Sequence, residues 1–180
     1  FGEGKVASVE ELKEKIKEDA ERQFAQQADQ KFLSDVTEAL IESTKFDLPN
    51  AFLKRWIMTA GETPLTAEQA EVEFAKSEKG LRYQLIEGRI VQQNNLQVSF
   101  EDLKKYAATI IRQQMAQFGQ TDPTDAEVEG VVARVLGNQD EVRRLSAQVM
   151  SEKMLALFKG KNSEEKEITY DSFVKEMYGE

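Results

Sequence analysis

The sequence contains no cysteine and no histidine among its 180 residues. The absence of cysteine excludes disulfide bonds, thiolate metal ligands and thiol nucleophiles. The absence of histidine removes the most common general base, the Ser-His-Asp triad and most transition-metal ligation. A hydrolase that uses carboxylates alone stays open, but no catalytic constellation, phosphate-binding loop or calcium loop is found. We therefore predict that this chain is not an enzyme and that it binds no metal and no cofactor.

Positive charge and long hydrophobic runs are also scarce. The chain has 24 Lys and Arg against 33 Asp and Glu, which gives a formal charge of 24 − 33 = −9. This acidic balance argues against direct nucleic-acid binding, because phosphate contacts need clustered cations. No apolar run approaches the roughly 20 residues that span a bilayer. We expect no nucleic-acid or membrane partner, and a cytoplasmic location.

Proline is rare, and its three positions divide the chain. Pro49, Pro64 and Pro123 each lie where the helical periodicity of apolar residues breaks. Almost all of the sequence between them follows that periodicity. The fold class is therefore predicted to be all-α, with at most two very short strands.

The first predicted helix is unusually long. Ser8 to Glu11 forms a capping box, and no glycine or proline interrupts residues 8–44. A helix of about 37 residues would be roughly 55 Å long, whereas a compact chain of this size has a diameter of only about 40 Å. We therefore expect an elongated molecule. The narrow apolar stripe in the middle of this helix favours contact with one or two neighbouring helices, and its members are Ile16, Ala20, Phe24 and Ala28.

Local signals place the remaining helices. Capping residues and helix-ending glycines predict helices over residues 49–60, 66–93, 99–118, 124–136 and 138–159, then a polar loop over 161–166 and a terminal helix after Tyr170. Gly80 and Gly88 lie inside one of these helices, which favours close helix–helix approach over a functional hinge. Trp56 is interpreted as a core anchor rather than a ligand platform.

The candidate binding residues flank the turn at Pro123. Met115 and Phe118 precede the turn, Val128 and Val131 follow it, and four glutamines surround the first pair. Flexible methionine and bulky phenylalanine among uncharged polar residues suit a surface that accepts many apolar sequences. The alternative is that these four are plain core residues of an antiparallel helix pair.

Several segments, in order along nearly the whole chain, resemble the C-terminal domain of bacterial trigger factor. The segments are Phe1-Gly2, Ser8-Val-Glu-Glu-Leu12, Lys45-Phe-Asp-Leu-Pro49-Asn-Ala-Phe-Leu53, the helix Gly80 to Asn95, Asp122-Pro123, and Glu167-Ile-Thr-Tyr170-Asp-Ser-Phe173. The resemblance implies a helical body with two protruding arms that form a cradle. It also implies that residues 1–180 are the chaperone domain of a longer protein. The segment from Met58 to Thr66 looks short for the family and contains a proline. The resemblance therefore leaves the length of one arm open.

The same resemblance implies a function. The family binds nascent or unfolded polypeptides without ATP, and its apolar cradle contacts fall on Met115, Phe118, Val128 and Val131. The ribosome-docking and prolyl-isomerase domains of the family have no counterpart in this sequence, so ribosome binding and isomerase activity would belong to the parent protein. Two other readings stay open: a helical scaffold or dimerisation module for one dedicated partner, and a weak homodimer.

Overall fold

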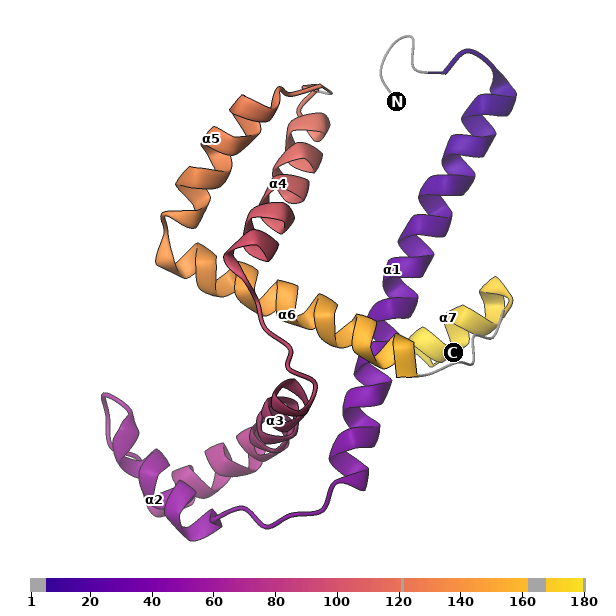
Figure 1. Cartoon of the computed structure of the whole chain (residues 1–180). Helices are drawn as coiled ribbons and strands as arrows, with labels where there is room; N and C mark the ends of the chain where they lie inside the picture. Colours follow the sequence, from indigo (N-terminus) through magenta and orange to yellow (C-terminus); the bar gives the residue numbers. More distant parts are fainter. Residues whose placement is uncertain (1–5, 121, 162–167, 180) are drawn as a thin grey trace. The chain divides into compact units, whose positions relative to one another are not determined.

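The computed structural model describes residues 6–120, 122–161 and 168–179, and every regular element in these ranges is a helix (Figure 1). The all-α prediction is confirmed, and the described residues contain neither of the two short strands that the sequence allowed. Phe1-Gly2 and residues 162–166 of the expected polar loop lie outside the described ranges. The helices are α1 (Val9–Ser43), α2 (Asn50–Ala60), α3 (Ala67–Gln93), α4 (Phe100–Gln117), α5 (Asp125–Leu136), α6 (Gln139–Lys161) and α7 (Tyr170–Tyr178).

Five of the described helices begin at hydroxyl side-chain caps, as the sequence predicts. A hydroxyl oxygen accepts the backbone N–H three residues later at the start of five helices, with N–H···O distances of 3.1–3.3 Å. Each such bond satisfies a donor that has no partner within its helix. The capping residues are Ser8, Thr66, Ser99, Thr124 and Thr169.

One predicted helix end is wrong. Gly160 was expected to close its helix, but α6 continues through it to Lys161. Gly119 behaves as predicted, because it follows the C-cap residue of α4 and has a φ of +88°. A positive φ carries little steric cost for glycine, which explains why this residue follows the end of α4.

The described helices belong to two compact units. The first unit contains α1, α2, the greater part of α3, and α7; the second contains the end of α3 together with α4, α5 and α6. None of the helices in the described part of the chain is long and apolar enough to cross a lipid bilayer.

The second unit has a continuous hydrophobic core. The periodic apolar faces of α4, α5 and α6 meet there, and the buried side chains are Leu103, Ala107, Ile111, Val128, Val132, Leu145 and Val149. A salt bridge also fastens α6 to the start of α4: the Lys153 ammonium donates to the Asp102 carboxylate at 2.8 Å and to the Gln97 carbonyl at 2.9 Å. This core holds the α4–α5 hairpin on α6.

The first unit buries fewer side chains. Among its described residues, the buried ones are Leu48, Ala70, Phe74 and Ile86. α1 buries none of its side chains, although its 35 residues correspond to roughly 52 Å of helix. Polar contacts join α3 to α1 and to the segment that follows α1. Lys79 pairs with Glu38 of α1 at 2.8 Å, and Arg82 donates to the Phe46 carbonyl at 2.7 Å. The thin apolar stripe of α1 thus agrees with its sequence pattern.

Two sequence-based interpretations of residues on α2 and α3 are wrong. A Cβ atom added at Gly80 or at Gly88 would meet no described atom within 4 Å, so neither glycine permits a close helix–helix approach. Trp56 is 58% exposed and is not a core anchor. Because α2 buries no side chain, its apolar residues are half-buried at most.

Candidate functional site

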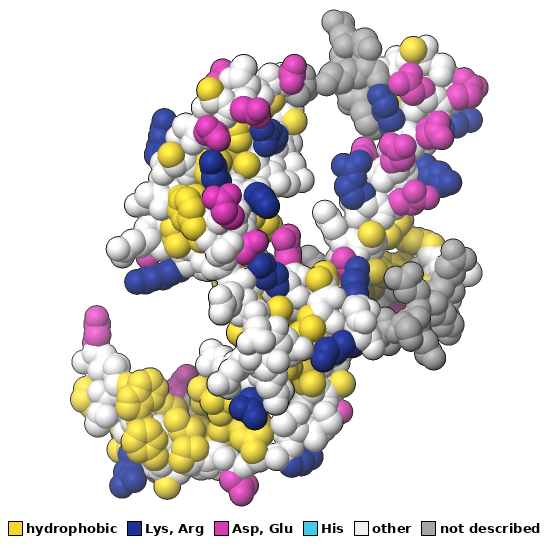
Figure 2. All heavy atoms as spheres, in the orientation of Figure 1, with side chains coloured by type: hydrophobic (Ala, Val, Ile, Leu, Met, Phe, Trp, Pro, Cys, Tyr) yellow, Lys and Arg dark blue, Asp and Glu magenta, His cyan; other side chains and the backbone are white. Residues whose placement is uncertain are grey.

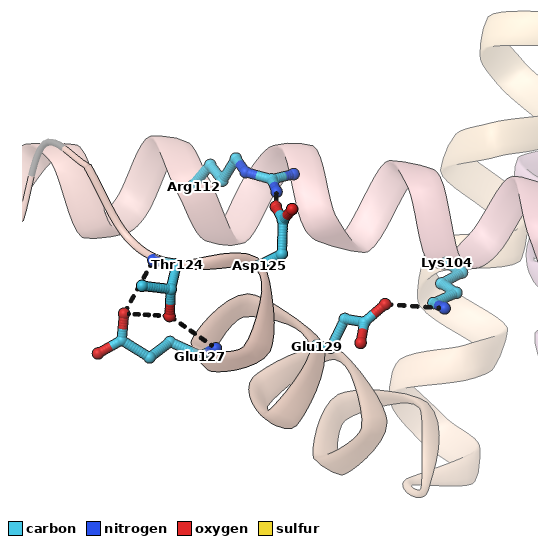
Figure 3. Close-up of polar contacts among 6 residues, drawn as sticks. All are labelled: Lys104, Arg112, Thr124, Asp125, Glu127 and Glu129. Carbon is cyan, nitrogen blue, oxygen red and sulfur yellow. Dashed lines mark hydrogen bonds and ion pairs between the residues drawn. The ribbon is translucent and has the colours of Figure 1, made fainter.

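Two ion pairs join the helices of the α4–α5 hairpin (Figure 3). Arg112 of α4 pairs with Asp125 at the start of α5, and Lys104 donates to Glu129 at 3.3 Å. Figure 3 also shows the capping box in which the Glu127 carboxylate accepts the backbone N–H of Thr124 at 2.9 Å. This hydrogen bond, with that of the Thr124 hydroxyl, lowers the pKa of Glu127.

The four predicted site residues on this hairpin differ in how much of their surface is exposed to solvent. Val128 is 1% exposed and belongs to the core of the second unit. Met115 and Val131 are half-buried and pack against that core. Phe118 is 90% exposed. Only Phe118 therefore presents its full side chain to solvent, and Val128 is corrected from a surface contact to a core residue.

The backbone holds Phe118 in this position. The Phe118 N–H donates to the carbonyls of Gln114 at 3.1 Å and Met115 at 3.2 Å. The next residues continue the turn, because the Gly119 N–H donates to Ala116 and the Gln120 N–H to Met115. These bonds satisfy the last carbonyls of α4. The exposed ring is thus carried on an ordered helix end.

A second exposed apolar region lies on the α2–α3 hairpin and was missed by the sequence analysis. Phe52 and Trp56 are one helical turn apart on α2, and both are exposed. Leu65 and Val72, with Glu68, Gln69 and Glu73, line a shallow groove of about 530 Å³ at the start of α3. Figure 2 shows hydrophobic side chains gathered over α2 and the adjoining part of α3. We call Phe52, Trp56, Leu65 and Val72 the α2–α3 apolar surface.

Contacts between the two helices fix the position of α2 on α3. The Lys54 ammonium pairs with Glu71 of α3 and lies 5.3 Å from the centre of the buried Phe74 ring. Across the turn, the Leu65 N–H donates to the Met58 carbonyl at 3.0 Å. α2 therefore has a defined position on α3 while Phe52 and Trp56 remain in solvent.

A local signal for part of this surface was present in the sequence. Val72 shares its helix face with Glu68 and Lys76, at spacings of four residues, which is typical of a solvent-facing position. No comparable signal marked Trp56, since Leu53 and Ile57 beside it predict a buried face equally well.

The described residues contain no group of three or more acidic side chains arranged to hold a metal ion. Among the described carboxylates, Asp102 has the most strongly perturbed pKa, which lies well below its usual range because Lys153 and Ser99 donate hydrogen bonds to it. The Lys153 bond connects α6 to α4 and the Ser99 bond caps α4, so both serve the fold. The exposed side chains of Phe52, Trp56 and Phe118 offer apolar contact.

Comparisons with known proteins agree with the helical architecture. The profile of the family described as "Probable trigger factor, C-terminal domain" matches residues 28–177. Trigger factor from Bordetella avium (strain 197N) is 26% identical over 178 residues, which cover 89% of this chain and 38% of that protein. The chain thus spans well under half the length of this relative. No solved structure gives a significant match. Since the profile covers most of the chain, the chain belongs to the family of trigger factor C-terminal domains.

Proposed function

We propose that this chain is an ATP-independent chaperone domain that binds exposed apolar segments of unfolded or nascent polypeptides. Family membership supports a chaperone-type role in general. The observation that carries the finer proposal is the exposure of large apolar side chains on ordered helices: Phe118 on the α4–α5 hairpin, and Phe52 and Trp56 on the α2–α3 apolar surface.

The two regions supply a weak and reversible mode of binding. Each large apolar side chain that leaves water contributes about 1.5–3 kcal/mol, and the loss of translational and rotational freedom offsets much of the sum. Several simultaneous contacts would leave a net binding free energy of about 8 kcal/mol, which corresponds to micromolar affinity. Met115, three residues before Phe118, and Val131 of α5 are half-buried and would add apolar contact with a bound segment.

We place other activities in the parent protein rather than in this chain. Peptidyl-prolyl isomerase activity and ribosome binding would come from domains of the longer protein, which we expect in the cytoplasm. The alternative function is a helical scaffold for one dedicated partner, which would cover the same apolar residues permanently. A weak homodimer would do the same between two copies.

The chain carries its own reporter for the first test. Trp56 is the single tryptophan and lies in the α2–α3 apolar surface. A permanently unfolded, reduced and alkylated protein should shift its emission to shorter wavelength in the micromolar range, without ATP. The chain should also reduce light scattering from an unrelated aggregating protein.

Matched variants localise the effect. Phe52→Ala and Phe118→Ala should each weaken the suppression of aggregation. Phe100→Ala, which removes an exposed ring outside both regions, should not. A folded chain that neither shifts its emission nor suppresses scattering would instead support the dedicated-partner alternative, and sedimentation velocity would identify a homodimer.

A further inference from the structure

α7 lies on α1 through aromatic side chains. The Phe24 ring of α1 contacts the ring of Tyr170 edge-on, with centroids 5.5 Å apart, and that of Phe173 at 5.8 Å. Such edge-to-face geometry is a favourable arrangement for aromatic pairs. Because Phe24 is the largest residue of the thin stripe in the middle of α1, α7 occupies the most apolar part of that stretch.

The contact leaves much of the apolar surface open. Phe24 remains 40% exposed and Tyr170 64% exposed. An apolar groove of about 330 Å³ lies beside the rings, and its walls are Phe24, Ala25, Ala28, Ile168, Tyr170 and Phe173. α7 therefore covers the Phe24 face without sealing it.

A charged residue of α7 also lies near α1. The Lys31 ammonium donates to the Asp35 carboxylate at 2.9 Å, and its raised pKa reflects this hydrogen bond first and then the nearby charges, including Glu176 of α7. Phe24 of α1 therefore contacts the start of α7, and Lys31 of α1 lies within the electrostatic reach of Glu176, near the end of α7.

The attachment of α7 is weak by its construction. Nine residues are too few for a stable isolated helix in water, so α7 depends on its contact with α1. That contact rests on a small set of partly exposed rings. A segment held in this way exchanges between docked and undocked states, and a competitor shifts the balance.

We propose that α7 is a built-in competitor for the Phe24 face of α1, and that an unfolded segment with aromatic residues spaced like Tyr170 and Phe173 binds this face when α7 leaves. The chemistry of the occupant is read from α7 itself, which supplies an aliphatic residue followed by two aromatic ones. This inference rests on the proposed function, because it adds a third region for client segments and a mechanism that regulates access to it.

The test uses the full chain and a fluorescent peptide with the sequence of residues 168–177. Binding of the peptide to the chain is measured by fluorescence anisotropy. Tyr170→Ala combined with Phe173→Ala removes the internal competitor. The peptide should bind this double variant about tenfold more tightly than the unaltered chain, a difference of about 1.4 kcal/mol. Phe24→Ala added to the double variant should remove the gain.

Two controls separate this effect from general changes. Lys175→Ala on the exposed side of α7 and Phe100→Ala in the second unit should leave the peptide affinity unchanged. A second measurement does not alter α7: in Phe24→Ala, amide hydrogen exchange over residues 170–178 should be about tenfold faster. α1 buries no side chain, so this variant should keep its helical content.

The outcomes distinguish the two proposals. Equal peptide affinity for the unaltered chain and the double variant, or unchanged exchange in Phe24→Ala, overturns the role of α7. If the emission of Trp56 still responds to an unfolded protein in that case, the proposed function stands. An unaltered chain with no Trp56 response and no effect on aggregation overturns the proposed function itself.

Discussion

Phe118 and Val128 lie on one helical hairpin, on either side of the same turn, with 90% and 1% of their side chains exposed. Sequence spacing placed both among the candidate contacts, but only tertiary packing decides which of them faces the core. Their difference in burial makes them a matched pair for separating binding from stability.

We expect Val128→Ala to lower the free energy of unfolding of the second unit by roughly 2 kcal/mol, because two buried methyl groups are lost and a cavity remains. Phe118→Ala should change it by less than about 0.5 kcal/mol, as is usual for exposed positions. Urea denaturation followed by far-UV circular dichroism measures both. A large loss of stability in Phe118→Ala would show that its ring is part of the core and would remove it from the proposed site.

Two glycines of the same hairpin should respond in opposite directions to alanine. Gly130 lies inside α5, and a Cβ atom added there would meet no described atom within 4 Å, so Gly130→Ala should raise the unfolding free energy by about 0.5–1 kcal/mol through better helix propensity. Gly119 has a φ of +88°, so Gly119→Ala should lower it by roughly 1–2 kcal/mol. Thermal melts of the two variants provide the comparison, and stabilisation by both would contradict the left-handed turn after Phe118.

At the scale of the helix, the start of α4 is held by a charged contact across the second unit. Ser99 and Lys153 both donate to the Asp102 carboxylate, at 2.7 and 2.8 Å. These bonds favour the ionised acid and hold the pKa of Asp102 well below its usual range. A carboxylate with a lowered pKa in the folded state stabilises the fold above its unfolded pKa and loses that effect as the pH falls.

Asp102→Asn should therefore lower the urea midpoint at pH 7. The gap to the unaltered chain should persist down to about pH 4, the ordinary pKa of the unfolded acid, and shrink below it. Glu101→Gln is the matched control, since Glu101 is the exposed acid next to Asp102 in the same helical turn. A gap that stays constant to pH 2 would show that the ionisation of Asp102 does not stabilise this unit.

The helices also show how far local sequence determines this fold. Five of them start at a hydroxyl cap that could be predicted, because the capping hydrogen bond joins residues three apart. The orientation of each helix could not be predicted in the same way. Trp56 was expected in a core and Gly80 against another helix, and both expectations failed because they depend on which distant segment lies opposite. The α2–α3 apolar surface was missed for the same reason.

Across the whole chain, buried apolar residues are unevenly shared between the two units. Those of the second unit form a continuous cluster over three helices, whereas α1 and α2 in the first unit bury none of their described side chains. Since burial of apolar surface is the main favourable term in folding, the first unit should be the less stable of the two.

Urea unfolding should accordingly occur in two steps. Trp56 reports only on the first unit, so its fluorescence midpoint should precede the midpoint of the far-UV signal, which reports on both. Leu145→Ala, which truncates a buried side chain of the second unit, should move the later step by about 2–5 kcal/mol and leave the Trp56 transition in place. Coincident transitions for both probes would show that the chain unfolds as one cooperative body.

The hydroxyl caps at the starts of five helices have a consequence for the time course of folding. Each cap and the first turn that it stabilises are complete within a few residues of chain, so these helices can begin to form while the rest of the polypeptide is still being synthesised. In the second unit, α4 and α5 are consecutive in sequence and pack on each other directly. Chains with such local contacts fold in microseconds to milliseconds, so the α4–α5 hairpin should form rapidly once both helices have been synthesised, whereas the first unit is complete only when α7 has reached α1.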